Sequence, residues 1–429
     1  MKARLRAGVN GRMRALRTRN FRLFFIGQLI SNSGNWLTMV ALTLLVLHET
    51  GSGVAVGALA ACQFGPILVL SPFAGLVADR SNKLRLLKIT QIGEMCQSLA
   101  LAALAFMHHP PLAAIYPVAV AGGCLLAFDN PVRRSFVTEM VPHDDVANAV
   151  TLYSALVNSS RIFGPALAGA LVVTAGYGWA FTLDAVSYVA VLVALWMMRP
   201  AELRPAEITP RGRGQVREGM RYVRSLPELW LPFVMLAVVG TLSYNFTVVF
   251  PLFVEHALHG SDASYTIIYS VFSAGSLVGA VAVADRKTVR VANIVVGAAA
   301  FGVSMLVLAA APTVATTLPI VAVLGFTSIV FMTSTTAIVQ VRADPRMQGR
   351  VLALQTVLLI GTTPVGGPLM GVVADTAGAR VPLVIGGVAA LLAALFGLVA
   401  GRTVLADRER ERPRPSTAPT PAASEAALG

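Results

Sequence analysis

Charged residues are scarce in this chain of 429 residues, because Asp, Glu, Lys and Arg together make up only 13% of it. A water-soluble domain usually carries about 25% charged residues, so this composition excludes an ordinary soluble protein. Hydrophobic residues make up 55% of the chain, and the mean hydropathy is +0.70. The sequence therefore predicts an integral membrane protein.

Cysteine is also rare, and the three cysteines, Cys62, Cys96 and Cys124, all lie in apolar stretches. This pattern indicates neither a disulfide framework nor a metal site, and we expect no metal and no cofactor. The chain has no G-x-S-x-G motif, no H-E-x-x-H motif and no glycine-rich loop ending in Lys-Ser or Lys-Thr. These absences argue against an enzyme and against an ATP-driven pump.

Long apolar runs are what the chain has instead. Each is about 20 residues or more, the length that a helix needs to cross about 30 Å of hydrocarbon. They lie at 23–47, 53–78, 86–107, 111–130, 148–173, 178–198, 229–254, 264–284, 291–311, 313–334, 351–374 and 381–401. Because the runs are unbroken and lack the alternating polarity of barrel strands, we predict an all-α membrane protein with twelve transmembrane helices.

Basic residues are distributed unevenly among the connecting segments. If the N-terminus is inside, all but two of the 34 Lys and Arg residues lie on the inner side; Arg161 falls in a span and Arg380 outside. The positive-inside rule then predicts a multi-pass protein of the plasma (cell inner) membrane with both termini in the cytoplasm. The formal net charge of +13 is explained by this topology and by anionic lipid, so we expect no nucleic-acid partner.

A stretch rich in Pro, Gly and Arg divides the chain at 199–228, and its second part suggests a short amphipathic helix with Val216, Met220 and Val223 on one face. We expect five segments: a basic cytoplasmic N-terminus at 1–22, an N-terminal six-helix bundle at 23–198, a cytoplasmic central loop at 199–228, a C-terminal six-helix bundle at 229–401 and a disordered cytoplasmic tail at 402–429.

The two halves resemble each other. "VADRSNKLR" is similar to "VADRKTVR", and "GPALAGALVVTAG" is similar to "GPLMGVVADTAG", each pair about 200 residues apart. This spacing predicts two six-helix pseudo-repeats. Such a parallel repeat is typical of transporters whose halves rock about a central site.

The segment "GLVADRSNKLR" resembles the loop signature of the major facilitator superfamily. The matching residues are Gly75, Asp79, Arg80, Lys83 and Arg85. Asn82 stands where that family usually has glycine, and we expect it to keep the tight turn because asparagine tolerates left-handed backbone. The resemblance implies an inner-gate loop in which Asp79 accepts hydrogen bonds from a facing helix N-terminus and the basic side chains pair across the halves. A solvated loop is the alternative.

Three longer segments resemble the branch of that superfamily that contains enterobactin exporters and macrolide efflux proteins. They are "RNFRLFFIGQLISNSGNWLTMVAL", "DNPVRRSFVTEMVPHDDVANAVTLYSALVNSSRIFGPALAG" and "LQTVLLIGTTPVGGPLMG". Gly164, Pro165 and Gly169 also look like the helix-5 motif of superfamily antiporters, which implies export. A structural kink that lets a partner helix approach explains the same residues.

One arginine, Arg161, lies in a predicted span, where a charge usually faces the bundle interior and has a partner. We expect Glu94 or Asp184 to be that partner, with Asp129 a third, shallower candidate at the inner end of its helix. The C-terminal spans contain no ionised residue, so we expect the coupling group in the N-terminal half. An ion pair that only locks this half is the alternative.

Polar residues mark the surfaces that we expect to line a cavity. Gln28, Asn32 and Asn35 recur along one face of the first predicted helix. The other candidates are Asn158, Tyr244, Asn245 and Gln355. The exporter branch often has an acidic residue near Asn35, and its absence here argues against proton binding at that spot.

These features together predict a secondary active transporter. We expect a monomeric, proton-coupled exporter of small amphipathic molecules such as drugs or siderophores, which it holds in a broad apolar cavity. The expected partners are this substrate, the proton and the lipid bilayer. The alternative is a non-transporting membrane sensor or scaffold that retains the transporter fold, and an intramembrane enzyme is a third, weaker possibility.

Overall fold

The computed structural model describes residues 13–204, 215–284 and 291–411, and these residues form helices and no strand. The N-terminal half comprises η1 (Arg14–Arg17), α2 (Arg19–Thr50), α3 (Gly53–Arg80), α4 (Lys83–Ala105), α5 (Leu112–Glu139), η2 (His143–Asp145), α6 (Val146–Ala175) and α7 (Tyr177–Trp196). The connection contains η3 (Pro200–Glu202) and α8 (Gln215–Ser225). The C-terminal half comprises α9 (Pro227–Leu242), α10 (Phe246–Leu252), the π-helical turn η4 (Phe253–Ala257), α11 (Asp262–Ala284), α12 (Val291–Ala309), α13 (Val314–Arg342), α14 (Pro345–Ile360), α15 (Thr363–Ala377) and α16 (Val381–Glu411).

Each predicted span coincides with a helix or with a broken pair of helices. Among the described residues, ten stretches are long and apolar enough to cross a membrane. The expected spans in α4 and α6 do not meet this criterion of length and hydropathy. The helix α4 has three basic residues in its first two turns and contains Glu94, and the described side chains of α6 include a shorter apolar stretch, Phe163–Ala175, because those of residues 158, 161 and 162 lie outside the description. The all-α membrane fold is confirmed, whereas the count of twelve spans remains a prediction.

Two of the predicted spans are interrupted, which corrects the expectation of unbroken helices. The first break separates α9 from α10, where the Asn245 side chain donates to the Thr241 carbonyl at 2.7 Å. The second separates α14 from α15, where Pro364 occupies the first turn of α15. Proline has no backbone N–H and suits a first helical turn, so the chain restarts there.

Three boundaries also differ from the sequence prediction. The helix α5 continues to Glu139, which places Arg133 inside a helix and not in a basic loop. The helix α16 continues to Glu411, so residues 402–411 are helical and not disordered, while 412–429 lie outside the described residues. The predicted amphipathic helix is present as α8, with Val223 buried and Arg217, Arg221 and Arg224 exposed.

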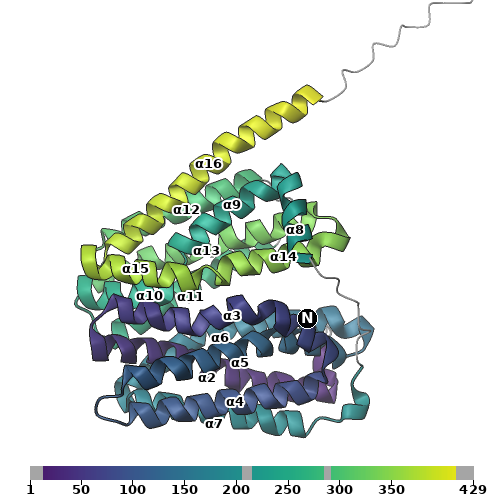
Figure 1. Cartoon of the computed structure of the whole chain (residues 1–429), viewed down its shortest axis with the longest axis vertical. Helices are drawn as coiled ribbons and strands as arrows, with labels where there is room; N and C mark the ends of the chain where they lie inside the picture. Colours follow the sequence, from purple (N-terminus) through teal and green to yellow (C-terminus); the bar gives the residue numbers. More distant parts are fainter. Residues whose placement is uncertain (1–12, 205–214, 285–290, 412–429) are drawn as a thin grey trace, which may run out of the picture.

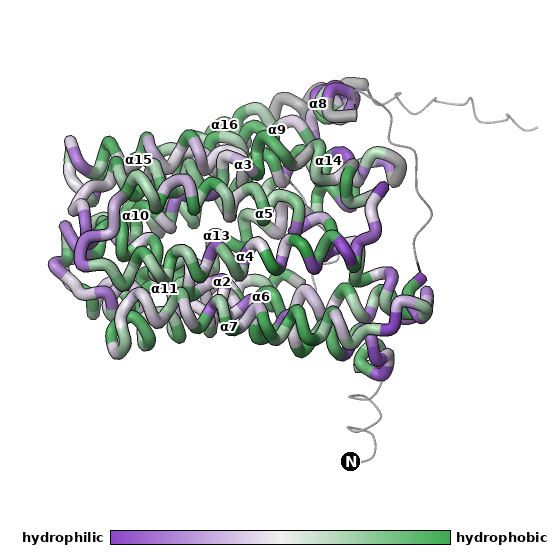
Figure 2. The backbone as a smooth tube through the Cα atoms, turned by 60° about the horizontal axis from the view of Figure 1, so that its bottom comes forward, coloured by the Kyte–Doolittle hydropathy of each residue, from purple (hydrophilic) through white to green (hydrophobic). Residues whose placement is uncertain are grey.

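The two groups of helices stack on each other, with α2–α7 below and α9–α16 above in Figure 1. We call the end of the bundle that carries the connection and α8 the proximal end, and the opposite end the distal end. Figure 2 shows hydrophilic residues gathered at both ends and hydrophobic residues along the helices between them. This is the distribution expected of a protein that spans a bilayer.

Glycines bring the halves into close contact along two seams, α3 with α15 and α6 with α11, which we call the distal seams. A methyl group on Gly371 would lie 2.1 Å from the Gly53 carbonyl oxygen, and one on Gly57 would lie 2.7 Å from Cα of Pro368. In the second seam, a methyl group on Gly169 would lie 2.1 Å from Thr266 Oγ1. Only glycine permits this approach, as in other small-residue helix contacts in membranes.

Candidate functional site

A buried ion cluster lies inside the N-terminal half. It consists of Arg133 and Asp129 on α5 and Glu94 on α4, all at most 3% exposed. Arg133 is in direct ionic contact with Asp129, and its Nη2 lies 3.8 Å from Glu94 Oε2. Asp129 and Arg133 are four residues apart, so they share one face of the helix. Two carboxylates therefore surround one guanidinium in the interior of an apolar bundle.

Neutral side chains hold the two carboxylates of the ion cluster in place. Gln91 Nε2 donates to Glu94 Oε2 and to Asp129 Oδ1, both at 2.9 Å, and Thr90 Oγ1 donates to Asp129 Oδ1 at 2.8 Å. Thr90 and Gln91 are themselves buried on α4. Buried charges need such donors to offset the lost hydration.

The helix α2 connects the ion cluster to a less buried surface. Gln28 Oε1 accepts from Arg133 Nη1 at 2.7 Å and from Asn32 Nδ2 at 3.2 Å. Gln28 is buried, whereas Asn32 and Asn35 are half-buried. Two residues of the predicted polar stripe, Gln28 and Asn32, therefore form a chain of hydrogen bonds that reaches the buried arginine, whereas Asn35 accepts from Tyr188 Oη of α7 at 2.8 Å.

Asp184 on α7 occupies a second buried site with a different chemistry. Its Oδ2 accepts from Thr38 Oγ1 at 2.5 Å and from Ser98 Oγ at 2.7 Å. Ser187 Oγ lies 3.4 Å from the other carboxylate oxygen. The helices α2, α4 and α7 thus surround Asp184 with hydroxyl groups.

The described structure gives other partners to the three carboxylates that we expected to pair with Arg161. Glu94 and Asp129 contact Arg133, and Asp184 is bound by hydroxyls. Asp129 is fully buried by protein, while its depth in the bilayer remains a prediction. The side chains of Arg161 and Asn158 lie outside the described part of α6, so the location of Arg161 remains a prediction.

Part of the inner-gate loop differs from the expectation. Lys83 forms an ion pair with Glu139 of α5, within its own half and not across the halves. Asn82 has φ −65°, which is not left-handed, and its side chain instead caps α4 by accepting from the Arg85 N–H at 3.0 Å. Gly75 and Arg80 lie on the last turns of α3, and the Asp79 side chain lies outside the described side chains.

The residues of the helix-5 motif lie within α6, which stays continuous through Pro165. A methyl group on Gly164 would lie 2.4 Å from Cβ of Trp36 on α2, and Gly169 meets α11 in the distal seam. The motif therefore supports close packing on both sides of α6. It also has a counterpart in Gly367, Pro368 and Gly371 of the other seam.

The polar residues of the C-terminal half are bonded within that half. Tyr244 Oη donates to the Ser328 carbonyl at 2.5 Å, and Gln355 Nε2 donates to Thr336 Oγ1 at 2.8 Å. Asn245 and Gln355 are at most 5% exposed, so they pack between helices in this structure and do not line an open surface. Only Tyr244 among these three is partly exposed.

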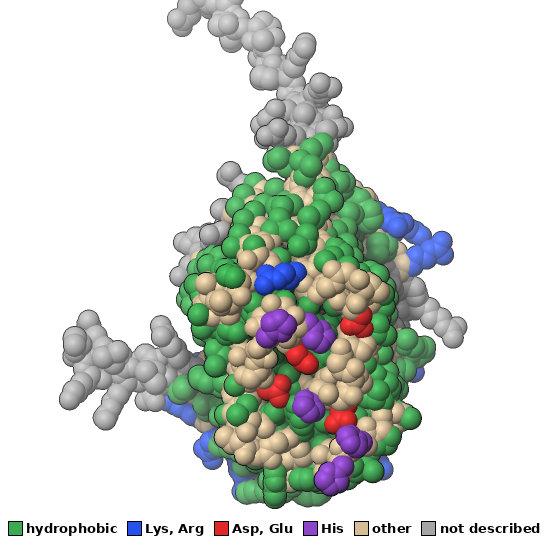
Figure 3. Space-filling model, turned by 90° about the vertical axis from the view of Figure 1, so that its left-hand side faces the viewer, with side chains coloured by type: hydrophobic (Ala, Val, Ile, Leu, Met, Phe, Trp, Pro, Cys, Tyr) green, Lys and Arg blue, Asp and Glu red, His purple; other side chains and the backbone are tan. Residues whose placement is uncertain are grey.

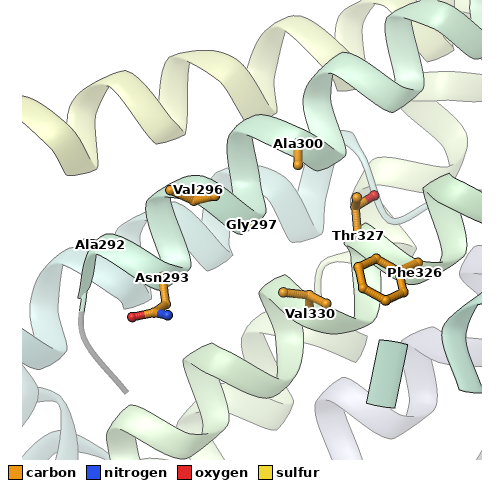
Figure 4. Close-up of a pocket in the computed structure, with 8 residues that line it drawn as sticks. All are labelled: Ala292, Asn293, Val296, Gly297, Ala300, Phe326, Thr327 and Val330. Carbon is orange, nitrogen blue, oxygen red and sulfur yellow. The ribbon is translucent and has the colours of Figure 1, made fainter. Parts of the chain in front are cut away.

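A hollow of about 340 Å³ lies between α12 and α13, with Asn293 and Val296 on one wall and Phe326 and Val330 on the other (Figure 4). Val296 is 67% exposed, so the hollow opens to the outside of the helix pair. Its described lining is mostly apolar and contains no charged residue. It is separate from the ion cluster, which lies in the other half of the chain.

The distal end carries histidines and carboxylates (Figure 3). The residues are His48, Glu49, His108, His109, Glu255, His256, His259, Asp262 and Asp375. Among the residues that the structure describes, Arg380 is the one basic side chain at this end, and it donates to the carbonyls of Ala309 and Ala311 at 2.6 and 2.7 Å. The proximal end carries most of the described Lys and Arg residues.

Side-chain hydrogen bonds join the halves at the distal end. Asp375 of α15 accepts from the backbone N–H groups of Gly53 and Val54 at 2.6 and 2.9 Å and from Ser52 Oγ at 2.7 Å. A carboxylate at a helix N-terminus also interacts favourably with the helix dipole. In the second seam, Tyr177 Oη donates to Asp262 Oδ2 at 2.8 Å. These bonds hold the distal end closed in this conformation.

Sequence reasoning missed several residues of the site, namely Arg133, Gln91, Thr90, Thr38, Ser98 and Tyr188. Arg133 falls among the basic residues of the inner side in the sequence prediction, because the fourth predicted span ends at residue 130. The four-residue spacing of Asp129 and Arg133 was the available signal for a shared helix face. The hydroxyl partners of Asp184 carry no such signal, since they come from separate helices.

Comparison with known proteins agrees with the geometry. The profile of a family described as transmembrane secretion effectors matches residues 11–425. The multidrug efflux pump Tap of Mycolicibacterium fortuitum is 26% identical over 377 residues, which cover 83% of this chain and 89% of that protein. Macrolide efflux protein A of Streptococcus pyogenes is 22% identical over a match that covers 83% of this chain and 90% of that protein. The staphyloferrin A transporter of Staphylococcus aureus is 24% identical, and that match covers 59% of this chain and only 64% of the transporter.

Solved structures share the fold at low sequence identity. A bacterial homolog of the human lysosomal transporter Spinster, in an inward-facing and unoccupied conformation, has a TM-score of 0.69 and 17% identity. That match covers 91% of this chain and 98% of the other. A POT family transporter in complex with a thioalcohol-conjugated peptide has a TM-score of 0.73 and 11% identity, with 90% of this chain and 96% of the other covered.

Proposed function

Because this chain belongs to the transmembrane secretion effector family of the major facilitator superfamily, and is thus a multi-pass membrane transporter of a small molecule, we propose that it exports amphipathic compounds in exchange for protons. The proposed location is a bacterial inner membrane, with the proximal end and both termini in the cytoplasm. The proposed unit is a monomer in the lipid bilayer.

The observation that carries the proton part is the pair of buried carboxyl sites between α4 and α7. Glu94 and Asp184 are at most 3% exposed, yet among the described side chains neither has a dedicated ionic partner of its own: Glu94 shares Arg133 with Asp129, and Asp184 is bound by hydroxyls. A carboxyl group in such a place is expensive to keep charged, so it is suited to bind and release a proton.

The proposed substrate class is based on the functions for which the relatives are named and on the composition of the described spans. Two relatives that align with more than four-fifths of this chain are named for the efflux of several drugs or of macrolides, and one is named for a siderophore. The described spans are rich in apolar side chains and contain few charges that would recognise a sugar or an amino acid. A small amphipathic compound fits such an interior.

The proposed mechanism of transport is alternating access. Closure of the distal seams in this conformation supports a state in which the central site communicates with the cytoplasm, and rocking of the halves would open it to the other side. The residues Gly75, Asp79, Arg80 and Arg85 are proposed to stabilise the opposite gate, while Lys83 supports α5 through Glu139.

The test is transport in inverted vesicles, with ethidium and erythromycin as probes. We expect accumulation that requires a lumen more acidic than the medium, so that protons leave the vesicle as the probe enters, and that falls at least tenfold in the Glu94→Gln, Asp184→Asn double variant. Glu255→Gln, an exposed carboxylate at the distal end, is the matched control and should leave transport unchanged. If a probe accumulates equally without the gradient, or in the double variant, then proton coupling is wrong. If no compound of a wider panel is moved, the sensor or scaffold alternative gains support.

A further inference from the structure

Aromatic rings from both halves form one cluster where the halves meet. Six rings contact one another in an unbroken series, with neighbouring ring centroids 4.7–6.1 Å apart. We call them the aromatic cluster, and they are Trp36, Tyr269, Phe250, Phe272, Phe246 and Tyr244. Of these six, only Trp36 belongs to the N-terminal half. Its indole lies 5.9 Å from the Tyr269 ring of α11 and therefore joins α2 to the other half.

The indole of Trp36 fits against a glycine of α6. A methyl group on Gly164 would lie 2.4 Å from Cβ and 2.6 Å from Cγ of Trp36. A larger residue at position 164 would therefore push the indole away from its present place. Because Gly164 belongs to the helix-5 motif, this motif leaves room for a ring that contacts the C-terminal half.

Burial along α2 changes near Trp36. Every residue of 40–47, toward the distal end, is at most 4% exposed, whereas Asn32 and Trp36 are half-buried. The C-terminal half changes in the same way, because Tyr244 is half-buried and residues 248–254, toward the distal end, are all buried. Trp36 and Tyr244 thus lie where the tightly packed distal part of each half begins. A site that communicates with the cytoplasm would end at this level.

Part of the aromatic cluster is tightly packed and part is open. Phe246, Phe250 and Tyr269 are at most 8% exposed, while the other three rings are half-buried. Rings that already pack against rings lose little further freedom when a ligand binds, so their open faces are preorganised. A flat ring that stacks on such a face gains more than its buried area alone would give.

Recognition of a charged group by an ion pair has little support at this place. The aromatic cluster contains no Asp, Glu, Lys or Arg, and the described buried ions Arg133, Asp129 and Glu94 contact one another inside the N-terminal half. The face of an aromatic ring carries partial negative charge. It therefore attracts a cation and disfavours a carboxylate.

We propose that the half-buried rings of the aromatic cluster, with Trp36 as the main one, form the subsite that binds the flat aromatic part of the exported compound. The preferred substrate is then a neutral or cationic compound with flat rings, and an anionic siderophore fits poorly. A compound without aromatic rings, such as a macrolide, contacts other apolar walls and not this subsite. The inference deepens the proposed function and rests on it for export itself. Gly164 is the positioning residue of Trp36.

Equilibrium binding to the purified full chain in lipid nanodiscs, without a proton gradient, tests the inference. The probes are ethidium, a flat aromatic cation, and erythromycin, a cation without an aromatic ring, so the two differ in rings and not in the sign of their charge. Trp36→Leu should weaken ethidium binding about tenfold, because ring stacking and the cation–π contact are lost. Erythromycin binding should change less than about twofold, and Trp36→Phe should retain part of the ethidium affinity.

Three further measurements serve as controls. Trp196→Leu, at the proximal end of α7 where the side chain is 60% exposed, should leave both affinities unchanged. Gly164→Ala keeps the indole but displaces it, and should weaken ethidium binding selectively. If Trp36→Leu folds poorly, a chain with Phe at positions 179, 196 and 230 keeps Trp36 as its one tryptophan. Ethidium should quench the fluorescence of that tryptophan, and erythromycin should not.

Several results would overturn the inference. Unchanged ethidium binding in Trp36→Leu, equal weakening of both probes, unquenched Trp36 with ethidium bound, or a parent protein that binds no ethidium would each reject the subsite. Normal ethidium affinity in Gly164→Ala would reject the positioning role. Ethidium binding that depends on Trp36, together with no transport in vesicles, would instead reject export and leave the subsite intact, so the two failures are distinguishable.

Discussion

At the scale of single residues, the position of one arginine decides how the N-terminal half is held together. Arg133 is 3% exposed, contacts Asp129 and Glu94, and donates to Gln28. Its neighbour Arg134 is exposed on the same helix. Adjacent arginines with the same helical context therefore have opposite environments.

Arg133→Met should be strongly destabilising, because it leaves two buried carboxyl groups without their cation. Breaking a buried ion pair in this way costs about 3–5 kcal/mol, whereas an exposed substitution usually changes stability by about 0.5 kcal/mol or less. Thermal unfolding of the purified protein should show a large decrease in Tm for Arg133→Met and little change for Arg134→Met. Equal Tm values for the two variants would show that the ion cluster does not stabilise the fold.

A second substitution should recover part of this loss. The double variant Arg133→Met, Asp129→Asn removes the charge of the closest carboxylate and should be more stable than Arg133→Met alone. Glu94→Gln in the same background should restore less, because Glu94 lies farther from the arginine, at 3.8 Å. The reverse order would mean that Glu94 is the main ionic partner.

At the scale of helices, the distal seams combine glycine contacts with a charged cap. The α3 N-terminus offers two N–H groups and the Ser52 hydroxyl to Asp375 of α15. Asp375 is exposed, so water and salt weaken this cap relative to a buried pair. A modest and reversible contact of this kind suits a gate, because the two halves must separate in each cycle.

Asp375→Asn should shift the protein toward states that are open at the distal end. The amide is neutral and offers one acceptor oxygen where the carboxylate has two, so the contacts to Gly53 and Val54 cannot both persist unchanged. Distances between spin labels at the distal ends of α3 and α15 should show a larger open fraction, by about two- to tenfold. The neighbouring exposed residue offers the control: Thr376→Ala should leave the distribution as in the parent.

Gly371→Ala tests the glycine contact separately. The added methyl group would meet the Gly53 carbonyl at 2.1 Å, so one helix backbone must move. The same distance measurement should again report an open distal end, together with slower transport. Gly65→Ala is a matched control on α3, because a methyl group there would have no neighbour within 4 Å. A normal closed fraction in Gly371→Ala would show that the seam adapts without opening.

At the scale of the whole molecule, the two ends of the bundle differ in charge. Most described Lys and Arg residues lie at the proximal end, and the distal end carries five histidines and four carboxylates around Arg380. This asymmetry supports the proposal that the distal end faces the outside of the cell.

Labelling of single cysteines in whole cells measures that orientation. In a background without Cys62, Cys96 and Cys124, a membrane-impermeant maleimide should label His109→Cys, whose side chain is 91% exposed at the distal end. Arg217→Cys on α8 should be labelled only in inverted vesicles. The opposite pattern would place the termini outside and would contradict the proposed orientation.

The sequence by itself determined the membrane class, the helical fold, the helix positions and the family, because apolar length, charge distribution and motif spacing are properties of the linear chain. It also indicated that Glu94 and Asp184 matter, since a carboxyl group in an apolar run has few explanations. Only the tertiary structure decided which groups meet. Arg133 is buried inside a helix because its charge is balanced by Asp129 on the same helix and by Glu94 on the adjacent α4. Asp184 is bound by hydroxyls of three helices, and such a set has no pattern in sequence because each helix contributes one short polar side chain at its own register.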